Sequence, residues 1–142
     1  MKRKLYSIFT FICTLVLGAM LFCGCNSGPV KASVVKTTDT MVVVKVEKVE
    51  GEATLMSVME TLKEEGELDF KVVNGMITEI NGVANPADFS SCWMLYTSDA
   101  ELSNSAWGTV EYDGQAMGSA IVGADTLTVA AGAYYVWSFQ SF

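Results

Sequence analysis

The first 24 residues constrain the fold most, because their pattern predicts that they are cleaved off and take no part in it. Lys2, Arg3 and Lys4 precede an apolar run at residues 5–22, and small residues follow at positions 23–25. A basic start, an apolar middle and a small-residue end are typical of an export signal, which is cleaved and forms no part of the fold. We therefore predict a signal peptide at residues 1–24. Its removal leaves 118 of the 142 residues, enough for one domain.

Cys25 directly follows the expected cleavage site. The run at residues 21–25 (LFCGC) resembles the signal of bacterial lipoproteins, in which this cysteine receives a diacylglyceryl group. The resemblance implies a lipidated Cys25, a membrane anchor and an extracytoplasmic location on the bacterial cell membrane. Two or three acyl chains anchor a protein stably, whereas one chain binds only marginally. Two alternatives stay open: residues 5–22 as an uncleaved helix, close to the roughly 20 residues that span a bilayer, and plain secretion.

Charge and composition exclude several classes of function. Without residues 1–24 the chain keeps six lysines, no arginine and all 16 acidic residues, a net charge of −10. Nucleic acids are bound through Lys and Arg, so we expect no nucleic-acid partner. The chain has no histidine, which excludes histidine-activated Ser or Cys nucleophiles and imidazole-based zinc sites. We expect no enzyme, no catalytic residue, no metal site and no cofactor, and interpret the acidic run at residues 64–69 as a solvated face.

Residues 25–40 are predicted to be a lipidated cysteine and a flexible tether of at most roughly 50 Å, and residues 41–142 a single domain. Period-two alternation predicts a strand at 42–46, with Val42, Val44 and Val46 on one side. Thr54 is a candidate N-cap for a helix whose apolar positions recur at helical spacing: Leu55, Val58, Met59 and Leu62.

The second half of the chain reads as short strands joined by turns. Asn74-Gly75 predicts a hairpin between residues 70–73 and 76–80, since these residues favour a type I′ turn. Residues 92–97 are predicted to form a strand, 107–112 and 115–119 a projecting ribbon, and 126–130 and 133–139 a closing hairpin. The resulting fold class is α+β, with one helix covering a mixed sheet.

Four short segments resemble the transcobalamin-like C-terminal domain family. They are Thr54-Leu55, ITEING at residues 77–82, CWMLY at 92–96 and VAAGAY at 129–134. The resemblance implies a β-grasp-like fold and a binding module on a bacterial surface protein; in animal vitamin carriers the family covers one face of cobalamin. The chain departs from the family pattern at Thr97-Ser98-Asp99 and at Ala133. Cobalamin binding is therefore carried over to no residue.

Aromatic residues are the candidates for a ligand-binding site. Strand alternation places Trp93 and Leu95 on one face and Tyr96 on the other. The same rule puts Tyr135 and Trp137 on one face of the last strand, opposite Tyr134, Val136 and Ser138. We expect a ligand to contact aromatic residues with flat apolar area and a polar edge, with core packing as the alternative for each: Trp107, Tyr112, Tyr96 and Trp93.

The sequence thus predicts a membrane-anchored lipoprotein that binds without catalysing a reaction. The expected partner is a small molecule such as a cobalamin-like cofactor, or a transporter or surface protein. The alternative is a structural or adhesive cell-surface module that contacts another domain or a cell-wall polymer.

Overall fold

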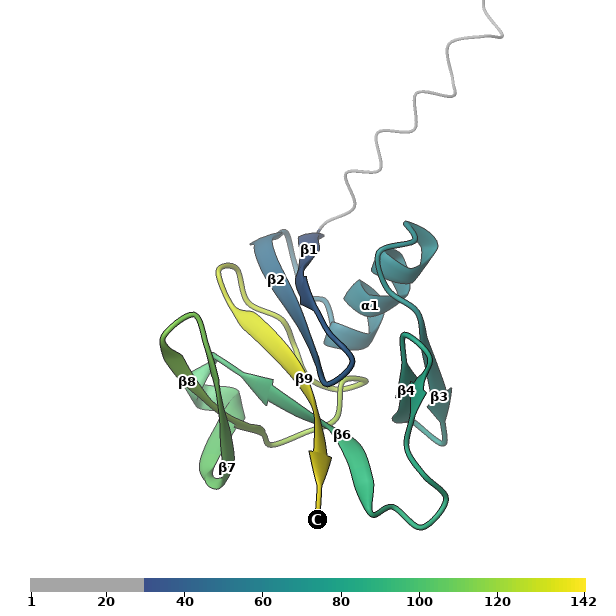
Figure 1. Cartoon of the computed structure of the whole chain (residues 1–142). Coiled ribbons are helices and arrows are strands. Elements are labelled where there is room, and N and C mark those ends of the chain that lie inside the picture. Colours follow the sequence, from purple (N-terminus) through teal and green to yellow (C-terminus); the bar gives the residue numbers. More distant parts are fainter. Residues whose placement is uncertain (1–29) are drawn as a thin grey trace, which may run out of the picture.

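A computed structural model of the chain describes residues 30–142, of which 54% lie in strands and 12% in helices. The predicted signal peptide and Cys25 lie outside these residues. The elements, shown in Figure 1, are β1 (Val30–Thr37), β2 (Met41–Val49), α1 (Leu55–Glu64), β3 (Phe70–Val73), β4 (Met76–Ile80), β5 (Val83–Ala84), β6 (Ser91–Thr97), η1 (Ala100–Leu102), β7 (Ser103–Tyr112), β8 (Gln115–Ala120) and β9 (Tyr134–Ser141).

The strands form two antiparallel sheets. The larger has the order β1-β2-β9-β6-β8-β7, and the smaller has the order β3-β4-β5. Every strand pair in the described residues is antiparallel. The predicted α+β class, with a β-grasp-like mixed sheet, is therefore wrong: the protein is predominantly β. A mixed sheet needs a parallel pair joined by a crossover, and α1 instead connects strands of different sheets.

The local predictions from turn and capping residues are confirmed. The Thr54 side chain accepts a hydrogen bond from the Ser57 amide at 3.3 Å, which caps α1. Asn74 and Gly75 both have positive φ, at 51° and 79°, as a type I′ turn between β3 and β4 requires. The strand predicted at residues 92–97 is β6. The sequence predicts these features correctly because each depends on residues that are close together in the chain.

Residues 30–37, predicted to be part of the tether, form β1. The strand pairs with β2 in the register Val34↔Val44, and its apolar residues Val30, Ala32 and Val34 pack on the core. The outer edge is protected, because the Val34 amide donates to the Glu67 carboxylate at 3.1 Å. Of the residues predicted to form the tether, 30–37 are therefore part of the larger sheet, and 25–29 lie outside the described part of the chain.

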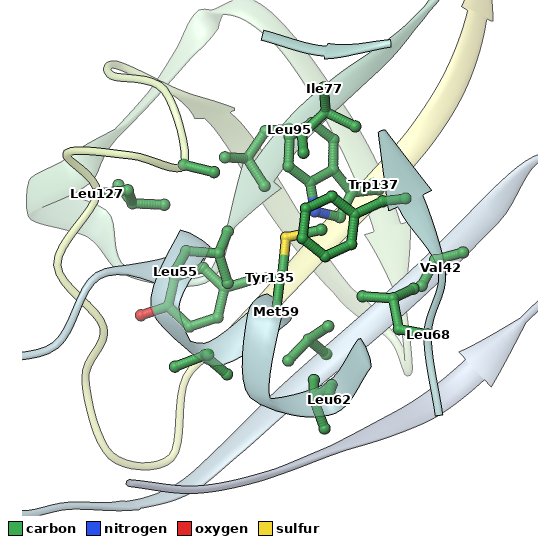
Figure 2. Close-up of a cluster of buried hydrophobic side chains, with 14 of the residues drawn as sticks. Val42, Leu55, Met59, Leu62, Leu68, Ile77, Leu95, Leu127, Tyr135 and Trp137 are labelled. Carbon is green, nitrogen blue, oxygen red and sulfur yellow. The ribbon is translucent and has the colours of Figure 1, made fainter. Parts of the chain in front are cut away.

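One face of the larger sheet carries the main core. Val42, Val44 and Val46 of β2 and Tyr135 and Trp137 of β9 face α1 and the smaller sheet, as strand alternation predicted. Figure 1 places α1 and the β3–β4 hairpin on this side of β2 and β9. Figure 2 shows the side chains of α1 that meet them: Leu55, Met59 and Leu62.

The opposite face carries a second, smaller core. Val43, Tyr96, Met117 and Val136 are buried there, with Met41, Met94, Val110, Tyr112 and Tyr134 partly buried around them. The predicted pairing of residues 107–112 with 115–119 is confirmed, but the ribbon does not project from the body. β8 joins β6 through Tyr96↔Ser119 and Thr97↔Gly118, and the hairpin packs over this face.

The hairpin predicted at residues 126–130 and 133–139 is wrong in its first half. Residues 126–130 form no strand and make a single bridge, Thr54↔Thr128. The start of α1 instead forms hydrogen bonds with the loop that contains these residues. The Leu55 amide donates to Leu127 O and the Met56 amide to Ala124 O, both at 2.8 Å. These bonds satisfy amides that have no partner within the helix.

Candidate functional site

The four aromatic residues predicted for a binding site fall in three different places. Trp93 is only 5% exposed and belongs to the main core. Its indole nitrogen donates to Val83 O at 2.8 Å, and its ring lies 5.2 Å from that of Phe139. Because its surface is covered and its only polar atom is paired, Trp93 stabilises the fold and offers nothing to a ligand.

Tyr96 and Tyr112 are brought together on the opposite face. Tyr96 is 5% exposed and forms the floor of the second core, while Tyr112 packs half-buried at its rim. Trp107 lies elsewhere. It stands 63% exposed in the irregular stretch between Asn104 and Thr109, where the β7–β8 register shifts.

Each of the two tyrosines at the rim of the second core has a lysine ammonium group over its ring. The rings of Tyr112 and Tyr134 lie 5.5 Å apart, tilted by 58°. Lys36 Nζ lies 5.7 Å from the centre of the Tyr112 ring, and Lys45 Nζ 5.3 Å from that of Tyr134. Both distances fall within the range of cation–π attraction. We name Lys36, Lys45, Tyr112 and Tyr134 the Lys–Tyr cluster.

The sheet register explains why these residues meet. Lys45 of β2 lies directly opposite Tyr134 of β9, and Lys36 of β1 lies opposite Val43 of β2. Side chains alternate along a strand, so Lys36, Lys45 and Tyr134 project from the same face as Val43. The folded-over β7–β8 hairpin then brings Tyr112 to them. The cluster thus unites three neighbouring strands and the tip of the hairpin.

The two lysines of the cluster differ from the other four that the structure describes. Lys31, Lys48, Lys63 and Lys71 each lie in an ion pair, with Glu47, Glu50, Asp69 and Glu79 respectively. Within the described residues, neither Lys36 nor Lys45 has a carboxylate within ion-pair distance. In a domain with a large excess of acidic residues, both lysines without an ion pair therefore lie on one face, and Lys45 is close enough to Glu47 to contribute to the lowered pKa of that carboxyl.

A shallow depression of about 450 Å³ adjoins the cluster. It is lined by small or polar residues and by one carboxylate, that of Asp99: Ser98, Asp99, Ala100, Gln115 and residues 130–133. Two contacts join it to the cluster. The Tyr134 amide donates to Ser98 Oγ at 2.9 Å, and Gln115 pairs with Tyr112 in the β7–β8 register. The depression therefore lies next to the cluster, although no residue of the cluster lines it.

Among the described residues, the shifts in pKa do not favour general-acid or nucleophilic chemistry. Each carboxyl with a shifted pKa is shifted downward: hydrogen bonds from Lys31 and Lys63 lower the pKa of Glu47 and of Asp69. Such groups stay ionised and cannot serve as general acids near neutral pH. Burial raises the pKa of the Cys92 thiol, which keeps it protonated rather than nucleophilic. Among residues 30–142, no three Asp, Glu or Cys side chains gather as metal ligands.

Sequence reasoning missed three of the four residues of the cluster as site residues. Tyr134 was assigned only a strand face, and Lys36 was placed in the tether. Lys45 falls within the predicted strand 42–46, on the side opposite Val42, Val44 and Val46. The contact of Lys45 with Tyr134 depends on pairing between strands about 90 residues apart in sequence, and no local pattern carries that information.

No family model, no curated protein and no solved structure matches the chain. The resemblance to the transcobalamin-like family therefore stays a prediction. In the described part of the chain, no helix has both the length and the apolar character that a membrane crossing requires.

Proposed function

We propose that the chain is a lipid-anchored, extracytoplasmic protein that binds a ligand without catalysing a reaction. The binding surface is the Lys–Tyr cluster together with the adjoining depression. The observation that carries the proposal is the contact between Tyr112 and Tyr134, with one lysine over each ring, beside an open polar surface. The arrangement offers aromatic rings, two ammonium groups and hydrogen-bonding side chains to a single ligand.

The anchor belongs to the same proposal and rests on the sequence around Cys25. Because β1 begins at Val30, the stretch from Cys25 spans five Cα–Cα steps, at most roughly 18 Å. A lipidated Cys25 would hold the domain against the membrane rather than at the end of a long tether. Such an anchor raises the local concentration of the domain near transporters and other envelope components.

The test of this proposal is a binding screen on residues 26–142. Both cores are built from residues within 30–142, so this piece holds all the packing that the structure describes. The panel would contain cobalamin, haem, and neutral and acidic oligosaccharides, with thermal shift as the readout. A ligand at a hundredfold excess over its Kd stabilises by about 2.7 kcal/mol, and absence of any shift across the panel counts against the proposal.

Two aromatic substitutions locate the site. Tyr134→Ala removes a ring of the Lys–Tyr cluster next to the depression, and should abolish the shift given by the bound ligand. Trp107→Ala removes an exposed ring of the β7 bulge and should leave it unchanged. The reverse result would move the site to Trp107, the residue that sequence reasoning favoured.

A second candidate function is a structural or adhesive contact with another protein. The observation that favours it is the tip of the β3–β4 hairpin, where Val73 and Met76 are 55% and 57% exposed. A double substitution of these residues to Ser would then reduce co-purification of a partner from the cell envelope, while leaving ligand-induced shifts intact.

A further inference from the structure

The Lys–Tyr cluster contains two lysines without an ion pair on a strongly acidic domain. Four of the six described lysines are neutralised by carboxylates, and the remaining two project from the same face of β1 and β2. Their ammonium nitrogens lie 5.7 and 5.3 Å from the centres of the Tyr112 and Tyr134 rings. An anionic ligand would form charge-assisted contacts with both ammonium groups, whereas a neutral ligand would gain none from them.

The surface around the cluster is long and shallow rather than enclosed. Lys36, Lys45 and Tyr134 lie on three successive strands, which spans roughly 10 Å at the usual strand spacing. The depression continues past Tyr134 to Ser98 and Gln115. A compact cofactor is normally surrounded by a deep apolar pocket, and this surface has none. Its shape suits an extended chain laid across the strands.

The polar groups along the surface match sugar hydroxyls. The Ser98 hydroxyl oxygen accepts from the Tyr134 amide and keeps its own hydrogen for donation. The Gln115 amide can both donate and accept, and the tyrosine rings provide apolar area for the carbon face of a sugar. An extended peptide would need pockets for apolar side chains, and the residues at the turn are small: Ala130, Ala131, Gly132 and Ala133.

We propose that the ligand is an acidic glycan, a sugar chain that carries carboxylate or phosphate groups. Its anionic groups pair with Lys36 and Lys45, and its sugar rings lie along Tyr134 and the depression. This inference rests on the proposed function and specifies the ligand class of the same site. It differs from nucleic-acid binding, because two lysines on a domain of net negative charge neutralise too few phosphates.

The test compares four probes on residues 26–142 by isothermal titration calorimetry. These are hexagalacturonate, which carries carboxylates; a glycerol phosphate oligomer, which carries phosphates; neutral maltohexaose; and hexaglutamate, an acidic peptide. We expect binding by one or both of the first two, weaker binding by maltohexaose and none by hexaglutamate. The affinity should fall as salt is raised, because exposed charge pairs are screened.

A matched pair of double variants isolates the charges. Lys36→Gln with Lys45→Gln should weaken binding of the acidic glycan about tenfold or more, since two charge-assisted contacts are lost. Lys31→Gln with Lys48→Gln removes the same charge from the same two strands, but from lysines already paired with Glu47 and Glu50. This control should bind as the parent does. Equal loss in both variants would show a bulk charge effect and overturn the inference.

The remaining outcomes separate the inference from the function on which it rests. Binding of maltohexaose or cobalamin that depends on Tyr134 but not on the lysines leaves the binding function standing and overturns the acidic class. Binding of hexaglutamate as tight as that of the glycans overturns the glycan class. If none of the probes in either panel binds, both the inference and the proposed function fail.

Discussion

The ring of Tyr112, at the end of β7, packs 5.5 Å from the ring of Tyr134, at the start of β9. In the sheet these two strands are separated by β6 and β8. Their contact is formed because the β7–β8 hairpin folds back over the sheet, where Met117 and Val110 cover Tyr96 and Val136. The same fold-back buries the second core and creates the Lys–Tyr cluster at its rim.

Met117 should therefore contribute to stability as a core residue. It is 1% exposed, and Met117→Ala should lower the free energy of unfolding by about 2–5 kcal/mol through lost burial and a cavity. Met76→Ala makes the same chemical change at a position that is 57% exposed, and should cost within about 0.5 kcal/mol. Urea unfolding measures both. Similar values for the two variants would show that the hairpin does not pack against the sheet.

Gly108 should resist substitution because of its backbone. Its φ is +134°, a conformation that residues with a Cβ rarely adopt, and an added Cβ would lie 3.6 Å from the Tyr96 hydroxyl. We expect Gly108→Ala to destabilise by about 1–3 kcal/mol from strain. Ser105→Ala, in the same exposed bulge, serves as the control in thermal unfolding and should behave like the parent. Equal melting temperatures would indicate that the bulge rearranges freely.

Acid should weaken the fold through its ion pairs. Hydrogen bonds from Lys63 to Asp69 and from Lys31 to Glu47 lower the pKa of each carboxyl below its ordinary value, 3.8 for Asp and 4.5 for Glu. A pKa that is lower in the folded state gives stability that is present above the unfolded pKa and lost as the pH falls through the folded one.

We therefore expect the urea midpoint to fall from about pH 4.5 downward. Asp69→Asn should make that decline shallower, whereas Glu60→Gln, on the exposed side of α1, should not alter it. Because both carboxyls are exposed, high salt should also flatten the curve. A midpoint that is constant down to about pH 2.5 would contradict a contribution from these pairs.

Cys25 should determine where the protein resides. Cys25→Ser removes the thiol that would accept lipid under the proposal, and the protein should then move from the membrane fraction to the soluble extracytoplasmic fraction. Mass spectrometry of the parent should show acyl chains on a chain that begins at Cys25. A variant that stays in the membrane fraction with residues 1–24 intact would establish the uncleaved helix instead.

The elements predicted correctly from the sequence are those determined by neighbouring residues. Thr54 caps α1, Asn74-Gly75 turns the β3–β4 hairpin, and alternation sets the faces of β6 and β9. What the sequence did not reveal depends on distant pairing. The polar composition of residues 30–37 hid a strand that forms only against β2, and residues 126–130 have strand-like composition but bind the start of α1.

The proposed binding site also combines residues that local patterns indicate with residues that they do not. Alternation correctly separated Trp93 from Tyr96, but it could not show that one would be sealed in the main core and the other covered by a hairpin. The sequence did not indicate the two lysines as site residues because what distinguishes them is the absence of an ion pair. Only the positions of all the carboxylates show that Lys36 and Lys45 are the described lysines without an ion pair.

The most direct test of the account is to map amide chemical shifts of residues 26–142 by NMR during titration with hexagalacturonate. We predict saturable changes grouped at Lys36, Lys45, Tyr134 and Gln115, with the β3–β4 hairpin tip unaffected. Changes centred on that tip or on Trp107, or no change at any concentration of the glycan, would contradict the assignment of the Lys–Tyr cluster as its binding surface.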